Sequence, residues 1–131
     1  MKAKKVLVAD DQASSRELLR VLLEHALNEK ACKVYEASDG FEAVAIARRT
    51  LPDVIFLDLD LPRLDAYAVV REMRQDPRLK TRPIVAMMGN AHDDSPDHLQ
   101  EAGFSGYITK PVFLRAFTAH LPQFLAAPQG R

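Results

Sequence analysis

Residues 53–62, "DVIFLDLDLP", form an apolar run that ends in two closely spaced aspartates and a proline. Val54 to Leu57 are apolar without polar alternation, which is typical of a strand covered on both faces of a sheet. Asp58 follows the apolar part directly, and Pro62 ends the extended segment. The pattern predicts a buried central strand with a carboxylate at its carboxyl end.

Similar apolar segments alternate with helical patterns on both sides of this strand. Four further strands are predicted over residues 4–11, 33–38, 83–88 and 104–109. Apolar residues at helical spacing predict helices over residues 13–29, 39–52, 65–77, 95–103 and 112–127, the last bent or frayed at Pro122. Five alternations indicate βαβ units, and hence an α/β fold in which helices cover both faces of a parallel sheet.

Helix start and stop signals support these boundaries. Ser14, with Glu17 three residues later, predicts a capping box for the first helix. Asp39 begins the second helix in the same way, because a glutamate again follows three residues later. Ser95 is placed as the N-cap of the fourth helix, and Gly103 as its stop.

The length of 131 residues favours one domain, with a core of about residues 4–126 and a loose tail over 127–131. A chain of this size buries enough surface to fold without disulfides. The single cysteine, Cys32, lies in a strand-like run, so we expect a buried thiol and a reducing compartment.

Charge and hydropathy exclude several classes of partner. Lysine plus arginine (18) balances aspartate plus glutamate (18), so no basic excess favours nucleic acid. No apolar run approaches the roughly 20 residues of a membrane span. The basic start is followed by only a short apolar stretch before two aspartates, which is too short for a signal peptide. We expect a cytoplasmic protein.

The predicted strand ends carry the chemistry. Parallel strands place their carboxyl ends at one edge of the sheet, where ligands bind. The first strand ends in Asp10 and Asp11, the third in Asp58, and the fifth is followed by Lys110. One aspartate after a strand is ordinarily a loop residue, but the joint pattern predicts three carboxylates and a lysine that meet.

Clustered carboxylates repel one another, and an oxygen-loving divalent cation such as Mg²⁺ or Mn²⁺ relieves this. A site with a metal, a lysine and a spare carboxylate is arranged to receive a phosphoryl group. The carboxylate attacks phosphorus and forms an acyl phosphate, while the positive charges stabilise the transferring group.

Four stretches together resemble a known family: "VLVADDQ" (6–12), "PDVIFLDLDLPRLDAY" (52–67), "PIVAMMGNA" (83–91) and "GYITKP" (106–111). They resemble the receiver domains of two-component response regulators, whose single-domain members include chemotaxis and sporulation regulators. The resemblance covers about residues 4–126. It implies a doubly wound, flavodoxin-like (βα)5 three-layer sandwich with strand order 2-1-3-4-5.

Position by position, the resemblance implies roles for the acidic cluster. Asp58 resembles the phosphoacceptor, which takes its phosphoryl group from a histidine kinase or a histidine phosphotransfer protein. Asp11 resembles the direct metal ligand, and Asp10 one that acts largely through metal-bound water. Asp60 resembles the residue that offers its backbone carbonyl to the metal, and Lys110 the lysine that pairs with the phosphoryl oxygen.

The resemblance also covers the switch. Tyr107 resembles the aromatic that moves between outward and inward positions, and the peptide before Pro111 is typically cis. Two residues depart from the family pattern. Ala66 stands where glycine is usual, for which we expect a small local effect. Met88 stands where a serine or threonine hydroxyl usually contacts the phosphoryl group, although the amide of Gly89 remains as a donor.

The missing hydroxyl removes one hydrogen bond to a charged group, roughly 1.5–3 kcal/mol. We therefore expect Asp58 to remain phosphorylatable, with a muted switch in which Tyr107 is held in one position.

The resemblance implies protein partners. A segment beside the site resembles the one that docks on a phosphotransfer bundle in sporulation-type regulators; its candidates are Gln12, Ala13, Ser14 and Leu18. No output domain follows the last helix, so we expect an unknown target protein to be bound through a surface. The last predicted helix carries an apolar stripe near one face, made of Phe113, Phe117, Leu121 and Phe124. We expect most of this stripe to lie in the core, and the alternative is an exposed dimer or target surface. The expected state is a monomer or weak homodimer.

Two alternatives remain. A pseudo-receiver would bind partners without phosphorylation, and Met88 is its sole support. A haloacid-dehalogenase-type phosphatase would explain the Asp-x-Asp motif at Asp58 and Asp60, but that fold usually places the motif on its first strand and needs a longer chain. We expect a phosphoacceptor with slow self-dephosphorylation at most, not an enzyme.

Overall fold

The computed structural model of the chain describes residues 3–28, 31–89 and 94–126. The strands are β1 (Lys4–Ala9), β2 (Cys32–Ala37), β3 (Val54–Asp58), β4 (Ile84–Met88) and β5 (Gly106–Thr109). The helices are α1 (Ala13–Leu27), α2 (Gly40–Thr50), α3 (Ala66–Gln75), α4 (Pro96–Ala102) and α5 (Leu114–Ala126). The predicted loose tail, residues 127–131, lies outside the described residues.

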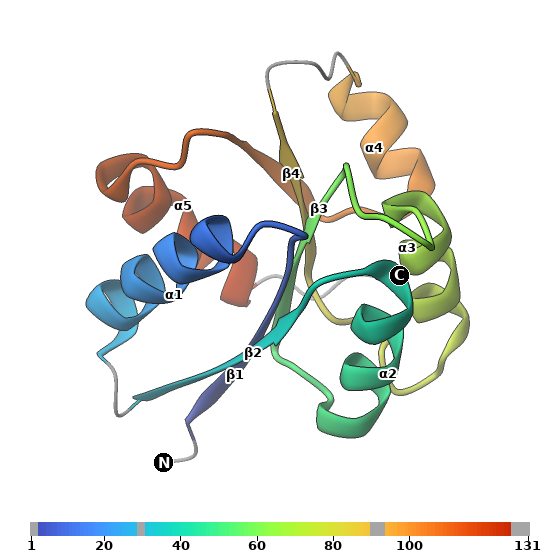
Figure 1. Cartoon of the computed structure of the whole chain (residues 1–131), viewed down its shortest axis with the longest axis horizontal. Helices are drawn as coiled ribbons and strands as arrows, with labels where there is room; N and C mark the ends of the chain where they lie inside the picture. The colour runs from blue at the N-terminus through green and yellow to red at the C-terminus, as the bar shows by residue number, and fades with distance from the viewer. Residues whose placement is uncertain (1–2, 29–30, 90–93, 127–131) are drawn as a thin grey trace.

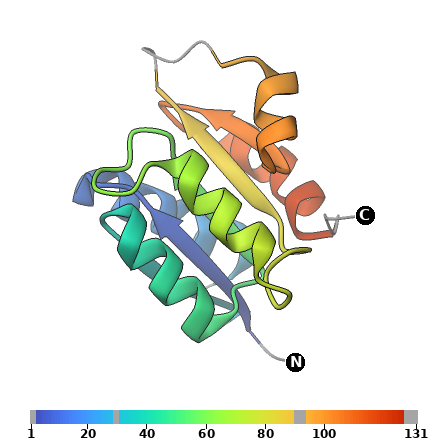
Figure 2. The ribbon, with the colours of Figure 1, turned by 90° about the vertical axis from the view of Figure 1, so that its right-hand side faces the viewer.

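The five strands form one parallel sheet in the order β2-β1-β3-β4-β5. Helices α1 and α5 cover one face, and α2, α3 and α4 cover the other (Figures 1 and 2). The prediction of a doubly wound, three-layer α/β fold is confirmed. The sheet order also brings β1 and β3 side by side at its centre, so the two acidic strand ends are neighbours.

Alternate residues of the central strands fill two separate apolar clusters. On β3, Phe56 faces α1 and α5, and its ring lies 5.8 Å from that of Phe117 and 6.3 Å from that of Phe124. Ile55 and Leu57 face α2, α3 and α4. Every residue of β3 is buried, as the unbroken apolar run predicts.

The two methionines that end β4 point to opposite faces of the sheet. Met87 lies in the cluster under α1 and α5, and Met88 in the cluster under α2, α3 and α4. The two residues are 2% and 8% exposed. The strand alternation thus places Met88 on the face of the sheet that α2, α3 and α4 cover.

Most of the predicted helix ends are found. The Asp39 side chain accepts a hydrogen bond from the N–H of Glu42 at 2.8 Å, and Ser95 caps α4 by accepting from the N–H of His98 at 3.1 Å. Gly103 ends α4 with φ of 116°, a conformation that glycine adopts without strain. Cys32 is buried and not disulfide-bonded.

The capping box at Ser14 is wrong. Helix α1 begins at Ala13, so Gln12 is the N-cap residue, and its side chain makes no capping hydrogen bond. Upstream of the helix, a carboxylate oxygen of Asp10 accepts the N–H of Gln12 at 3.0 Å, so Gln12 rather than Ser14 stands at the N-cap. Ser14 therefore lies inside the first turn of α1 and not at its N-cap.

Among the helices of the described residues, none combines the length and the apolar character that crossing a membrane requires.

Candidate functional site

Four side chains meet at the carboxyl edge of the sheet. The Lys110 Nζ lies 2.6 Å from a carboxylate oxygen of Asp10 and 3.1 Å from one of Asp58. Carboxylate oxygens of Asp10, Asp11 and Asp58 lie within 4.8 Å of one another. Asp10 and Asp11 follow β1, Asp58 ends β3, and Lys110 follows β5. The topology therefore brings together residues separated by as many as 100 positions.

The backbone of the two methionines of β4 holds this edge in register. The N–H of Leu59, directly after Asp58, donates to the carbonyl of Met87 at 3.1 Å. On the other side, the N–H of Lys110 donates to the carbonyl of Met88 at 2.7 Å. The end of β4 thus positions both the acceptor strand and the lysine through main-chain hydrogen bonds.

Asp58 is 3% exposed and accepts hydrogen bonds at both carboxylate oxygens. One oxygen accepts the N–H of Asp60 at 3.1 Å, and the other accepts Lys110. Burial raises the pKa of Asp58, and the negative charge of Asp10 acts in the same direction. The two hydrogen bonds oppose this rise without cancelling it. A cation beside Asp58 would favour its charged form.

Lys110 remains a cation at neutral pH. Burial acts to lower its pKa, but the hydrogen bonds and negative charges of Asp10 and Asp58 outweigh burial, and the net pKa is raised. The ammonium group therefore supplies one fixed positive charge to the site.

Asp10 and Asp11 differ sharply in their surroundings. Asp10 is fully buried, and it bonds Lys110 and the N–H of Gln12 through its two carboxylate oxygens. Asp11 is exposed, and its side chain accepts no hydrogen bond from the described residues. Asp10 is thus held in place by hydrogen bonds, whereas Asp11 is open to solvent.

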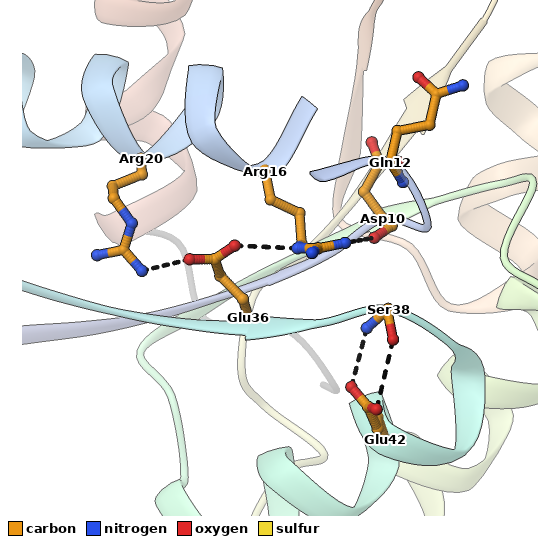
Figure 3. A network of polar contacts seen from close by, with 7 residues as sticks. All are labelled: Asp10, Gln12, Arg16, Arg20, Glu36, Ser38 and Glu42. Carbon is orange, nitrogen blue, oxygen red and sulfur yellow. Dashed lines mark hydrogen bonds and ion pairs between the residues drawn. The ribbon is translucent and has the colours of Figure 1, made fainter. Parts of the chain in front are cut away.

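Sequence reasoning missed Arg16, whose guanidinium donates to the backbone carbonyl of Asp10 at 2.8 Å (Figure 3). It is an arginine in the first turns of a helix that directly follows an acidic pair. The sequence therefore placed it near the site, but it gave no sign that the side chain would turn toward the strand end.

The predicted switch residues are placed as follows. Met88 is buried, Gly89 is half-buried, and Tyr107 is exposed at 42%. The Lys110–Pro111 peptide bond is cis. Ala66 is fully buried at the start of α3 and has no positive φ, so the usual glycine is not needed for backbone freedom here.

The predicted partner segment lies at the surface. Gln12, Ala13 and Ser14 are exposed, and Leu18 is exposed at 44%. A cavity of about 290 Å³ lies beside this segment; its lining residues are Asp10, Ser15, Leu18, Leu19, Met87, Lys110, Pro111 and Val112. The α1 surface and the loop after β5 therefore border the acidic cluster together.

The predicted apolar stripe of α5 is divided. Phe117 and Leu121 are buried in the core, whereas Phe113 is 67% exposed just before the helix. Phe124 is partly buried against the same core, so Phe113 is the residue of the stripe most open to a partner.

The acidic cluster fits a hard divalent cation. Its donors are three carboxylates, two of them held by hydrogen bonds, and oxygen donors of this kind suit Mg²⁺ or Mn²⁺. The exposed Asp11 leaves the outer side of the cluster open to water and to a second molecule.

Residues 6–121 match a family model described as the response regulator receiver domain. The chain is 32% identical to the protein PilG of Pseudomonas aeruginosa over 124 residues, which cover 92% of this chain and 89% of PilG. It is also 38% identical to the response regulator PleD of Caulobacter vibrioides over 111 residues. That match covers 82% of this chain but 23% of PleD, so PleD is several times longer than the shared region.

Solved structures agree with the sequence matches. One is the receiver domain of the sensor histidine kinase PA1611 from Pseudomonas aeruginosa PAO1, with a magnesium ion coordinated in its active site cleft. The TM-score is 0.82 at 26% identity, over 95% of this chain and 99% of that chain.

Proposed function

The chain belongs to the family of response regulator receiver domains, and on that premise we propose that Asp58 accepts a phosphoryl group from a histidine kinase or a histidine phosphotransfer protein. One observation carries the proposal: the buried Asp58 carboxylate lies between Lys110 and the N–H of Asp60, within reach of two further carboxylates. Receiver domains are signalling proteins, so we assign no turnover beyond slow self-dephosphorylation.

In the proposed step, a carboxylate oxygen of Asp58 forms a bond to phosphorus. The bond from phosphorus to the imidazole nitrogen of the donor breaks, and its electron pair stays on that nitrogen. The Lys110 ammonium, now shared by Asp10 and Asp58, pairs with the oxygens of the transferred group. Asp10 keeps its contacts to Lys110 and Gln12, so the lysine stays in place during transfer.

We assign Mg²⁺ or Mn²⁺ to the same site. Asp11 and Asp58 would hold the ion directly, Asp60 through its backbone carbonyl, and Asp10 largely through water. The bound ion supplies charge neutralisation for the phosphoryl oxygens.

We propose that Met88 mutes the switch. A thioether donates no hydrogen bond, so phosphorylation cannot draw the start of the β4–α4 connection inward through this side chain. Burial of Met88 among apolar side chains supports the proposal, because the residue has a packing role that does not depend on a ligand. Tyr107 then stays in its exposed position.

We propose that the phosphodonor docks on Gln12, Ala13, Ser14 and Leu18. Their exposure next to the acidic cluster supports this docking, as does the neighbouring cavity. The signal would pass to an unidentified target protein in the cytoplasm, with the chain as a monomer or weak homodimer. The balanced charge of the chain supports protein partners over nucleic acid.

The deciding experiment is phosphorylation of the full chain by acetyl phosphate and MgCl₂, followed by intact mass measurement. We expect the mass to rise by one phosphoryl group in the wild type and in Asp60→Asn, and to stay unchanged in Asp58→Asn. Asp60→Asn is the matched control, because it removes a neighbouring carboxylate from the same loop. Candidate histidine kinases are then tested as donors with the same three proteins.

No gain of mass in the wild type, beside a receiver that gains mass under the same conditions, would favour the pseudo-receiver. That alternative rests on Met88. The phosphatase alternative has lost its basis, because the chain belongs to a family of signalling proteins.

A further inference from the structure

Asp11 is the least constrained carboxylate of the acidic cluster. Asp10 and Asp58 are buried and share Lys110, whereas Asp11 is exposed and its side chain receives no hydrogen bond from the described residues. The position of the Asp11 carboxylate therefore depends on the backbone that leads into it.

That backbone is fixed by hydrogen bonds on both sides of Asp10. The N–H of Asp10 donates to the carbonyl of Ala37 at 3.0 Å, and Arg16 Nη1 donates to the carbonyl of Asp10 at 2.8 Å (Figure 3). The peptide group is planar, so holding this carbonyl also sets the position of the Asp11 nitrogen and Cα. Arg16 thus controls the direction in which Asp11 leaves the strand.

Arg16 is itself held from β2. Its Nε donates to a carboxylate oxygen of Glu36 at 2.9 Å, and the other oxygen of Glu36 accepts from Arg20 (Figure 3). The Arg16 side chain is 19% exposed and that of Glu36 is 31% exposed. The planar guanidinium offers several donors in a rigid arrangement, so one side chain can bond the carboxylate and the carbonyl together.

We propose that Arg16 is a positioning residue for Asp11, and that the affinity of the site for Mg²⁺ therefore depends on Arg16. The Arg16 guanidinium itself bonds Glu36 and the Asp10 carbonyl. The inference rests on the proposed function in one respect, that the three carboxylates hold the cation. Arg16 acts through the Asp10–Asp11 peptide and is not a ligand.

Simple electrostatics and positioning predict opposite changes in Mg²⁺ affinity when Arg16 is replaced. Arg16 is a positive charge near an acidic site, so removing that charge alone would tighten Mg²⁺ binding. Loss of positioning would weaken it instead. Arg20 is the matched control, because it has the same charge, lies one turn further along α1, and bonds Glu36 but not Asp10.

The test is a titration of the 131-residue chain with MgCl₂, in which amide NMR shifts report the binding. Substitution of residues behind metal ligands typically changes affinity ~10–100-fold, and the backbone route here is weaker, so we expect roughly three- to tenfold weaker binding in Arg16→Gln. Arg20→Gln should bind Mg²⁺ about as the wild type does or slightly more tightly. Arg16→Lys keeps the positive charge but loses the planar guanidinium with its several donors, so this variant should also bind Mg²⁺ less tightly than the wild type does.

Thermal unfolding without Mg²⁺ separates positioning from general stability. A merely structural role would lower the Tm of the Arg16 and Arg20 variants and leave Mg²⁺ affinity equal between them. Equal affinities, or tighter binding in Arg16→Gln, would overturn the proposal. If Arg16→Gln does not fold, the affinity of Arg16→Lys decides.

Failure of this inference is distinct from failure of the proposed function. Phosphorylation of Asp58 is tested by mass, and positioning is tested by Mg²⁺ affinity without any phosphodonor. A wild type that gains no mass would remove the proposed function, while weaker Mg²⁺ binding in Arg16→Gln would still support the positioning role.

Discussion

At the scale of single residues, Met88 is the residue that bears most directly on how the site signals. It is buried in the apolar cluster beneath α2, α3 and α4, yet its backbone carbonyl accepts the N–H of Lys110. The main chain of Met88 therefore supports the site, while its side chain offers the site no donor. A substitution can change the side chain and leave the main-chain contact in place.

We expect Met88→Thr to stabilise the phosphorylated state. One hydrogen bond to a charged group contributes about 1.5–3 kcal/mol, so phosphorylation or its lifetime should improve by roughly ten- to a hundredfold. The smaller side chain should also lower the free energy of unfolding by about 1–3 kcal/mol, because it leaves a cavity. The time course of mass gain and loss with acetyl phosphate measures the first effect, and urea unfolding the second.

Met88→Leu is the matched control, since leucine has a similar volume and no hydroxyl. If Met88→Thr and Met88→Leu gained and lost the phosphoryl group at the same rates, the hydroxyl would have no role at this position.

At the scale of elements, Tyr67 and Arg74 each join α3 to neighbouring segments of the chain. The Tyr67 hydroxyl donates to Asp94 at 2.7 Å, just before α4, and the Tyr67 ring packs against those of His98 and Phe104. Burial raises the pKa of Tyr67, and the bond to Asp94 adds to this rise. The start of α4 is therefore tied to the start of α3.

We expect Tyr67→Phe to lower the free energy of unfolding by about 0.5–1.5 kcal/mol and to speed hydrogen exchange in α4. The native state keeps the phenol proton to higher pH than the unfolded chain does. Wild-type stability should therefore fall as pH rises above about 10, the ordinary tyrosine pKa, and the variant should lack this part of the fall. A parallel loss of stability in both proteins above that pH would contradict the assignment.

Arg74 is the second connection. Its guanidinium donates to the carbonyls of Gly103, Lys80 and Arg82 at 2.9, 3.0 and 2.7 Å, and to the Ser105 hydroxyl at 3.2 Å. Burial lowers its pKa to about 10. One side chain thus joins the end of α3, the end of α4 and the segment before β4.

We expect Arg74→Ala to lower the free energy of unfolding by about 1–3 kcal/mol, because several carbonyls, most of them partly buried, lose their donor. Arg71→Ala is the matched control on the same helix. Arg71 is exposed and makes no hydrogen bond or ion pair to the described residues, so its replacement should change stability by less than about 0.5 kcal/mol. Urea unfolding of both variants measures the difference, and equal stabilities would show that the Arg74 contacts contribute little.

At the scale of the whole molecule, the parallel sheet gathers like charges at one edge. Asp10, Asp11 and Asp58 repel one another, and Lys110 offsets only part of that repulsion. The fold therefore carries unfavourable electrostatic energy at its site, which a bound cation would relieve. Stability and metal binding should be linked.

We expect Mg²⁺ at about ten times its Kd to raise the free energy of unfolding by about 1.4 kcal/mol, and EDTA to reverse this. Asp11→Asn should lose most of the increment and leave metal-free stability unchanged or slightly higher, because Asp11 has no bonding partner among the described residues. Asp60→Asn should keep the increment, since only its carbonyl is assigned to the ion. Thermal unfolding with and without Mg²⁺ measures all three, and an undiminished increment in Asp11→Asn would exclude it as a ligand.

The sequence by itself determined the layers of the molecule and the edge at which the site lies. The apolar runs and helical spacing are local features, and so are the helix starts at Asp39 and Ser95, because each involves residues close together in the chain. Parallel pairing then places Asp10, Asp11, Asp58 and Lys110 at the same edge of the sheet, and the strand order brings them together.

Only the tertiary structure decided how those groups are held. The bonds from Arg16 to Glu36 and from Arg74 to Ser105 join residues 20 and 31 positions apart, and no local pattern encodes them. The N-cap of α1 was mispredicted for the same reason, since the chain before the helix is held by the buried Asp10 carboxylate, which also bonds the distant Lys110. Local propensity is read from neighbours in sequence, whereas these contacts exist only once the helices have packed on the sheet.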